Sequence, residues 1–191
     1  MFSGDLEYLL TSLPYLRFTD SIEERNRVTS IFKAYASSKE SLSLTNILNQ
    51  ESAKYLSPKE QTLFKKIELD KIHTTEFLTS KYRVLSGFST FFIKLKTELK
   101  SLRENRMQSS QFSKKSRNTI ELEAGNPLDQ EIQIMHLQWR EVEKLSIGHF
   151  SDVDSLIGYK IKLLLLQRWW SFDREVGFER YLDLIKMSDN G

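Results

Sequence analysis

The sequence predicts an all-α protein, and three observations lead to this prediction. Glycine and proline are scarce, with 7 Gly and 3 Pro in 191 residues, which is few for a protein built on tight turns. Apolar residues recur at spacings of three and four, the period of a helix with one buried face. Several of these segments begin at a cap residue that precedes proline or acidic residues. The expected architecture is an elongated helical bundle with one long helix as its spine.

The N-terminal part of the chain contains four short segments. Residues 1–18 are apolar with a break at Pro14, and form either a short helix or an extended segment packed on the body. A helix is expected from Asp20, with Glu23 at capping-box spacing. Another begins at Ser57, where a serine cap precedes Pro58. Between them a short helix is expected. The residues expected to be buried here are Ile22, Val28, Ile31, Phe32, Tyr35, Leu42, Leu44, Ile47, Leu48, Leu63, Phe64 and Ile67.

The longest predicted helix runs from Thr75 to Arg103. Nine apolar residues follow the helical period there, so the helix would be about 43 Å long. A compact globule of this chain length has a radius of gyration of about 16 Å, which predicts an elongated molecule. Small residues occupy the other face and indicate either close helix contact or a solvated face. The solvated face is favoured, because Arg83 and Lys94 share it. The small residues are Ser80, Ser86, Gly87, Ser89 and Thr90.

A polar, basic linker at 105–119 divides the chain into an N-terminal part (1–104) and a C-terminal part (120–191), which together are expected to form one continuous bundle. Lys114, Lys115 and Arg117 supply most of its charge. The linker is either a mobile loop or a contact for an anionic partner. Aromatic residues that would stack on bases are not interleaved with these cations, so no nucleic-acid partner is expected.

The C-terminal part is predicted to hold two long helices and a final short one. The first begins at Asn126, which precedes a proline, and ends at Gly148. The second begins at Asp152 and is apolar on both sides, which is typical of a helix at the centre of a bundle. A short helix, Phe178 to Met187, follows Gly177.

Composition and motifs exclude several kinds of chemistry. The chain has no cysteine, so disulfides, thiolate catalysis and cysteine-based zinc sites are excluded. The three histidines are scattered, and neither a nucleophile turn nor a glycine-rich phosphate loop is present. We therefore expect no catalytic residue, metal or cofactor. The acidic start argues against a signal peptide, and the most apolar run is too short to span a bilayer. A cytoplasmic protein is expected.

Two residues near the end of the central helix are candidate contacts for a partner protein. Arg168 falls near the middle of an apolar face, where a buried arginine needs a carboxylate or carbonyl partner. It either forms an ion pair within the bundle or reaches a partner. Trp170, on the opposite face, either belongs to the core or is an exposed aromatic anchor.

The same region resembles a known family. The matching pattern comprises Asn126-Pro127-Leu128, Trp139, the Gly148-His149-Phe150 turn, and a leucine-rich helix that closes on Arg168-Trp169, Phe172-Asp173 and Gly177. An N-terminal Tyr8-Leu9 and Ser12-Leu13-Pro14 segment is also similar. These residues resemble a bacterial family encoded in V-type ATPase operons. Members of that family look like reduced relatives of the V-type ATPase component known as the C subunit in bacteria and the d subunit in eukaryotes.

The resemblance implies a helical, non-catalytic subunit or accessory protein. It would couple the central rotor shaft to the membrane ring or assist assembly, with ATPase subunits as partners and the membrane reached only through the complex. The candidate partner contacts are Arg168, Trp170, Arg174, Lys114, Lys115 and Arg117. Two alternatives stay open, namely a general helical adaptor with no ATPase link and an RNA-binding module that uses the basic linker.

Overall fold

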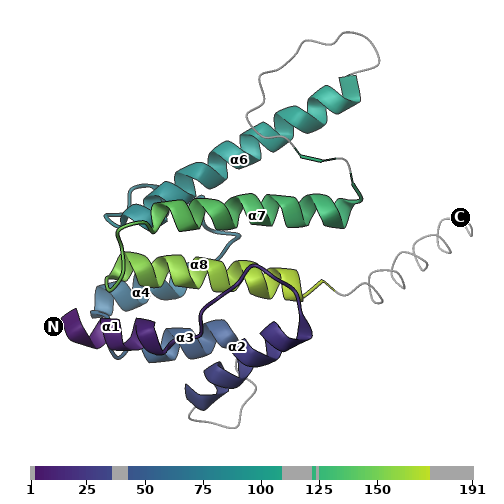
Figure 1. Cartoon of the computed structure of the whole chain (residues 1–191). Coiled ribbons are helices and arrows are strands. Elements are labelled where there is room, and N and C mark those ends of the chain that lie inside the picture. Colours follow the sequence, from purple (N-terminus) through teal and green to yellow (C-terminus); the bar gives the residue numbers. More distant parts are fainter. Residues whose placement is uncertain (1–2, 36–42, 109–121, 124, 173–191) are drawn as a thin grey trace, which may run out of the picture.

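The computed structural model describes residues 3–35, 43–108, 122–123 and 125–172 (Figure 1). These residues form helices joined by turns and contain no strand, so the all-α prediction is confirmed. The helices are α1 (Ser3–Ser12), α2 (Ile22–Tyr35), α3 (Leu44–Ser52), α4 (Pro58–Lys66), α5 (Thr75–Leu78), α6 (Arg83–Gln108), α7 (Pro127–Leu145) and α8 (Val153–Trp170). In this part of the chain, no helix combines the length and the apolar character that crossing a bilayer requires.

Helix α8 lies at the centre of the bundle, as its two apolar faces predicted. It runs antiparallel to α7 and packs against α3, α6 and α7 (Figure 1). Helices from before and after the basic linker therefore share one core. The buried apolar side chains of α8 are Leu156, Ile157, Ile161, Leu163, Leu165 and Leu166.

The predicted long helix is two helices. After α5 the chain turns through Thr79, and α6 begins only at Arg83. The start of α6 is capped by a residue of another helix. Asp154 Oδ1 on α8 accepts a hydrogen bond of 2.7 Å from the Val84 N–H. A carboxylate that accepts a first-turn N–H stabilises a helix start. The prediction that the helix begins at Thr75 is therefore wrong, and α6, with 26 residues, is about 39 Å long.

We expect Asp154→Ala to lower the free energy of unfolding by about 1–2 kcal/mol, because it removes the cap of α6. Chemical denaturation monitored by circular dichroism measures this change. Asp154→Asn is the matched control, since its amide oxygen can still accept from Val84, and it should lose less than the alanine variant. Equal stability of the alanine variant and the unmodified protein would contradict the assignment.

The small-residue face of α6 is packed rather than solvated where the helix begins. A methyl group at Gly87 would lie 2.7 Å from Leu145 Cδ2 of α7, so glycine permits the close approach of these two helices. Ser89 is fully buried, and its hydroxyl donates to the Ile72 carbonyl. The favoured interpretation of a solvated face is thus wrong for these two residues, while Thr90 is exposed.

Towards the C-terminal end of α6, α6 and α7 diverge (Figure 1). Up to Glu104, Leu95 is the last fully buried residue of α6, and Leu99 and Leu102, which the periodicity predicts as part of the same stripe, are only half-buried. The helix itself continues to Gln108, so residues 105–108 belong to α6 and not to the linker.

The N-terminal segment contains both of the structures considered for it. Helix α1 ends at Ser12, and an extended stretch then crosses α8 (Figure 1). Its carbonyls accept hydrogen bonds from the bundle, since Tyr159 donates to Pro14 O at 2.8 Å and Trp170 Nε1 donates to Thr19 O at 3.1 Å. Side chains from α8 therefore hold this stretch against the core.

The start of α2 differs from its prediction. Helix α2 begins at Ile22, and Ser21 Oγ accepts from the Glu24 N–H at 3.2 Å, so Ser21 rather than Asp20 provides the cap. Asp20 instead pairs with Arg25. Ile22, predicted to be buried, is 74% exposed because the apolar face begins only at Val28.

The other predicted helix starts are confirmed. Ser57 and Glu60 form the capping box of α4, Asn126 accepts from the Asp129 N–H at the start of α7, and Asp152 caps α8. Gly148, with φ of 88°, follows the end of α7, and such a backbone conformation favours glycine. The predicted helix from Phe178 to Met187 lies outside the described residues.

Candidate functional site

Arg168 lies at the surface, near the C-terminal end of α8, and not within an apolar face. Its Nη2 is 2.7 Å from Glu131 Oε1 of α7, and its side chain is 45% exposed. Of the two interpretations, the ion pair between helices is present. Because both groups reach solvent, the pair contributes little stability, and Arg168 retains donors that a partner could use.

Trp170 and Trp169 close the core at this end of the bundle. Both are half-buried. The indole of Trp170 is fixed by its hydrogen bond to Thr19, and the ring of Trp169 lies 4.5 Å from that of Phe18. Trp170 therefore belongs mainly to the core, while part of its ring stays accessible.

The other candidate partner contacts cannot be placed. Arg174, Lys114, Lys115 and Arg117 lie outside the described residues. Their role stays a prediction.

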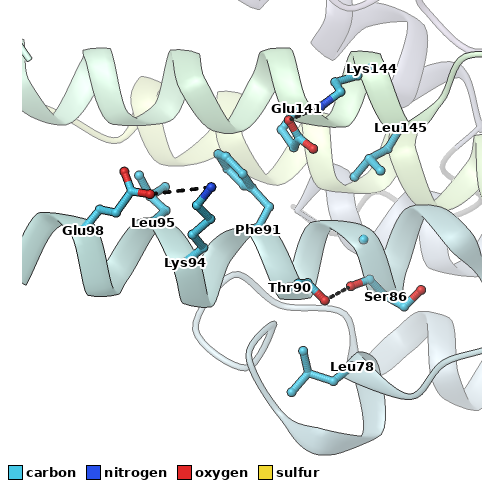
Figure 2. Close-up of a pocket in the computed structure, with 11 residues that line it drawn as sticks. Leu78, Ser86, Thr90, Phe91, Lys94, Leu95, Glu98, Glu141, Lys144 and Leu145 are labelled. Carbon is cyan, nitrogen blue, oxygen red and sulfur yellow. Dashed lines mark hydrogen bonds and ion pairs between the residues drawn. The ribbon is translucent and has the colours of Figure 1, made fainter. Parts of the chain in front are cut away.

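A groove between α6 and α7 was not foreseen from the sequence. It has a volume of about 680 Å³ and lies between α6 and α7, beside α5 (Figure 2). Apolar side chains from α5, α6 and α7 line it, namely Leu78, Phe91, Leu95 and Leu145. The only feature of the sequence that relates to this groove is the periodic apolar stripe of α6. The stripe does not indicate which of its residues are left uncovered by another helix.

Charged side chains alternate along the walls of the groove. On α6, Lys94 and Glu98 lie 3.7 Å apart at their nearest charged atoms, and on α7 Glu141 and Lys144 have the same separation. The two carboxylate side chains are 17% and 20% exposed, whereas the two lysines are 67% and 74% exposed. The two carboxylates are therefore the more covered charges of the groove, while both lysines, which also line it, are largely exposed.

Lys160 is the most unusual polar residue of the described chain, and sequence reasoning missed it. It lies on α8 between Tyr159 and Ile161 and is fully buried. Its amine donates to Asn49 Oδ1 of α3 at 2.9 Å and to the Phe64 carbonyl near the end of α4, and it lies 4.5 Å from the centre of the Phe64 ring. One side chain therefore joins three helices.

Burial lowers the pKa of Lys160 to about 7, because the charged amine loses its hydration, and the nearby charge of Glu68 opposes this shift. A lysine with a lowered pKa resembles a catalytic amine. Here the amine is enclosed and its hydrogen bonds go to structural groups. We therefore assign Lys160 a structural role.

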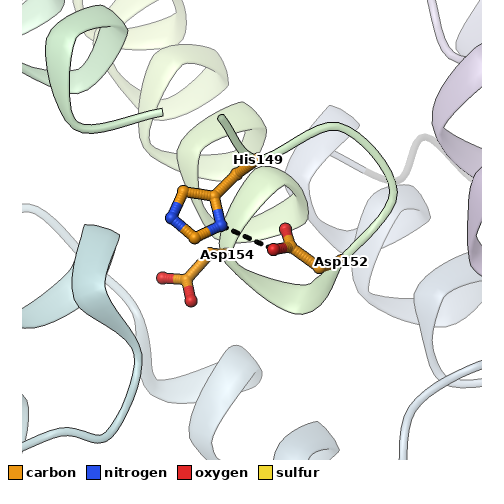
Figure 3. Close-up of side chains that lie close together, drawn as sticks. All are labelled: His149, Asp152 and Asp154. Atoms are coloured by element: carbon orange, nitrogen blue, oxygen red, sulfur yellow. Dashed lines mark hydrogen bonds and ion pairs between the residues drawn. The ribbon is translucent and has the colours of Figure 1, made fainter. Parts of the chain in front are cut away.

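A cluster of His149, Asp152 and Asp154 lies at the start of α8 (Figure 3). Their candidate ligand atoms are within 4.8 Å of one another, and His149 Nδ1 is 2.5 Å from Asp152 Oδ2. Such a group of side chains can bind a cation, but here the side chains form hydrogen bonds within the protein.

The carboxylates of this cluster serve as helix caps. Asp152 Oδ1 accepts from the Ser155 N–H at 2.8 Å, and Asp154 Oδ1 accepts from the Val84 N–H. Partial burial acts to raise the pKa of Asp152, but hydrogen bonds with His149 and Ser155 outweigh it and lower this pKa overall. The cluster therefore has a structural role where α6, α7 and α8 meet, because its carboxylates cap α6 and α8.

Comparisons with known proteins assign no function to this chain. Residues 110–191 match a family described as "Protein of unknown function (DUF2764)". The match covers less than half of the chain and includes Asn126 to Gly177, the region on which the resemblance rests. A search of curated proteins gave no match. A search of solved structures gave none either. Since the family description names no activity, function has to be inferred from the residues and surfaces described above.

Proposed function

We propose that this protein is a non-catalytic subunit or accessory protein of a V-type ATPase. It would couple the rotor shaft to the membrane ring or assist assembly, on the inner face of the cell membrane. The observation that carries the proposal is the sequence pattern from Asn126 to Gly177. The helical bundle supports it, because an all-helical architecture is what the resemblance implies.

The character of the surfaces also supports a binding role. The groove between α6 and α7 is open, and apolar and charged side chains of α5, α6 and α7 line it. Such a surface suits a protein partner. The perturbed Lys160 and the His149 cluster have structural explanations. Neither needs a reaction to account for its position.

Copurification tests the proposal. A tagged protein, purified from detergent-solubilised cells of its own source, should bring down identified ATPase subunits in amounts comparable to its own. The untagged strain is the control. Absence of every ATPase subunit from the purified material would end the proposal.

The variant Trp170→Ala shows whether the end of α8 contributes to assembly. We expect a loss of about 2–3 kcal/mol in the free energy of unfolding, because a half-buried ring and its hydrogen bond to Thr19 are removed. Denaturation measures this loss, and Trp170→Phe, which keeps a ring, should lose less. Unchanged stability with loss of copurification would instead assign Trp170 to an interface.

A general helical adaptor is the second candidate. The groove between α6 and α7 favours it equally, because its shape and charge do not depend on an ATPase. Gene neighbourhood separates the two candidates, since an ATPase component is expected beside ATPase genes.

A further inference from the structure

The groove between α6 and α7 has the form of a helix-binding site. Its two walls are antiparallel helices that lie close together at Gly87 and Leu145 and separate towards the C-terminal end of α6 (Figure 1). Phe91 and Leu95 face it from α6. Beyond Leu95, the side chains described on α6, up to Glu104, are exposed or half-buried. A third helix that packs in this space, at an ordinary interhelical distance of about 8–10 Å, would cover Phe91, Leu95 and Glu98, which line the groove.

Glu98 indicates the charge of the occupant. Its Oε2 is buried and has no hydrogen-bond partner within the described part of the chain. Lys94 lies 3.7 Å from the other oxygen, which is beyond hydrogen-bonding distance, and extends into solvent. A buried carboxylate oxygen without a donor is costly, and a charged donor offsets that cost best.

Glu141 is a second carboxylate on the opposite wall. Its carboxylate is largely covered, while the amine of Lys144 is exposed (Figure 2). Because Lys94 and Lys144 are largely exposed, the covered charges of the groove are its two carboxylates. An occupant with basic side chains would be complementary to both walls.

We propose that the groove binds an amphipathic helix of a partner protein, with apolar side chains packed on Phe91, Leu95 and Leu145 and an arginine or lysine paired with Glu98. A helix fits because residues three and four apart share one face and can present both groups together. This inference adds to the proposed function the kind of partner surface that the groove would bind. That the partner is an ATPase subunit rests on the proposed function.

Calorimetric titration of the full chain with a synthetic peptide tests the groove directly. The probe is a helical peptide of about 18 residues, about 27 Å long, with leucines on one face flanked by arginines. We expect one peptide to bind per chain. The matched peptide has glutamates in place of the arginines and should bind at least about tenfold more weakly, because it places like charges beside Glu98 and Glu141.

Three variants locate the binding. Glu98→Gln should weaken binding of the arginine peptide about tenfold, because a charge-assisted hydrogen bond is lost. Thr90→Trp, at an exposed position lining the groove, should fill it and abolish binding. Glu104→Gln, on the same helix but 58% exposed, should leave binding unchanged. Circular dichroism confirms that each variant is folded.

The inference is overturned if the arginine peptide does not bind at low salt, or if folded Thr90→Trp binds it as well as the unmodified chain. Copurification with Thr90→Trp separates this inference from the proposed function. If the unmodified chain and Thr90→Trp capture the same ATPase subunits, the groove is not the docking site while the function stands. If neither captures them, the function fails, and the titration still decides the groove.

Discussion

Lys160→Met should stabilise the protein below pH 7 by on the order of a few kcal/mol, and this advantage should shrink as the pH rises towards about 9.5. The unmodified chain keeps a fully buried amine at the centre of the bundle. Methionine has a similar length and no charge, so it fills the same space without the cost of desolvation. Two acceptors lose a donor, but the Phe64 carbonyl also accepts from the Ile67 N–H, and Asn49 is only half-buried.

The pH dependence follows from the lowered pKa of Lys160. In the folded state this pKa is about 7, against an ordinary value of 10.5. Between these values the unfolded chain binds a proton that the folded chain has released, so the stability of the unmodified protein rises with pH across this window. The full shift corresponds to about 5 kcal/mol at most. Below pH 7 both states are protonated and the penalty is fully present.

Urea denaturation at pH 6, about 8 and about 9.5 measures the effect. Higher pH is avoided because burial raises the pKa values of Tyr82 and Tyr159, so ionisation of these phenols would oppose folding there. Lys100→Met is the matched control, since Lys100 is 77% exposed and its replacement should change neither stability nor its pH dependence beyond a few tenths of a kcal/mol. A Lys160→Met variant that is less stable than the unmodified chain at pH 6 would show that the hydrogen bonds to Asn49 and Phe64 outweigh desolvation.

Trp139→Ala should cost about 3–5 kcal/mol of stability, the usual range for a buried tryptophan. Trp139 is 4% exposed on α7 and joins several elements. Its Nε1 donates to Glu143 at 2.9 Å, Lys162 of α8 lies over its ring at 4.8 Å, and Phe18 of the N-terminal segment lies 5.4 Å from it. Alanine therefore leaves a cavity where α7, α8 and the N-terminal segment meet.

Thermal and chemical denaturation measure the loss, and Trp139→Phe, which keeps an aromatic ring but not the hydrogen bond, should lose clearly less. Phe150→Ala is the control for removal of an exposed aromatic side chain, because Phe150 is 82% exposed. If Trp139→Ala and Phe150→Ala were equally stable, the packing described for Trp139 would be wrong.

Much of the fold was predictable because its signals are local. Ser57, Asn126 and Asp152 cap helices whose first turns follow directly in the sequence, and the two apolar faces of α8 indicate a central helix without reference to its neighbours. The break before α6 was not predictable, since the apolar period continues through it. The cap that stabilises the new start comes from Asp154, seventy positions away.

The candidate sites were less predictable than the fold. Arg168 looked buried by its place in the helical period, yet α8 ends two residues later and its guanidinium reaches the surface beside Glu131. Lys160 has no distinctive neighbours in the sequence, and only the packing of α3 and α4 on α8 encloses it. The partner contacts at Arg174, Lys114, Lys115 and Arg117 stay predictions.

Local sequence patterns specify the helical class, most helix starts and the central position of α8, because helical periodicity and capping depend on residues within about one turn of one another. The packing of the helices, by contrast, sets where α6 begins, which polar side chains are buried and where a groove remains open. These properties depend on the distances between helices and on which faces meet, and segments far apart in the sequence set both.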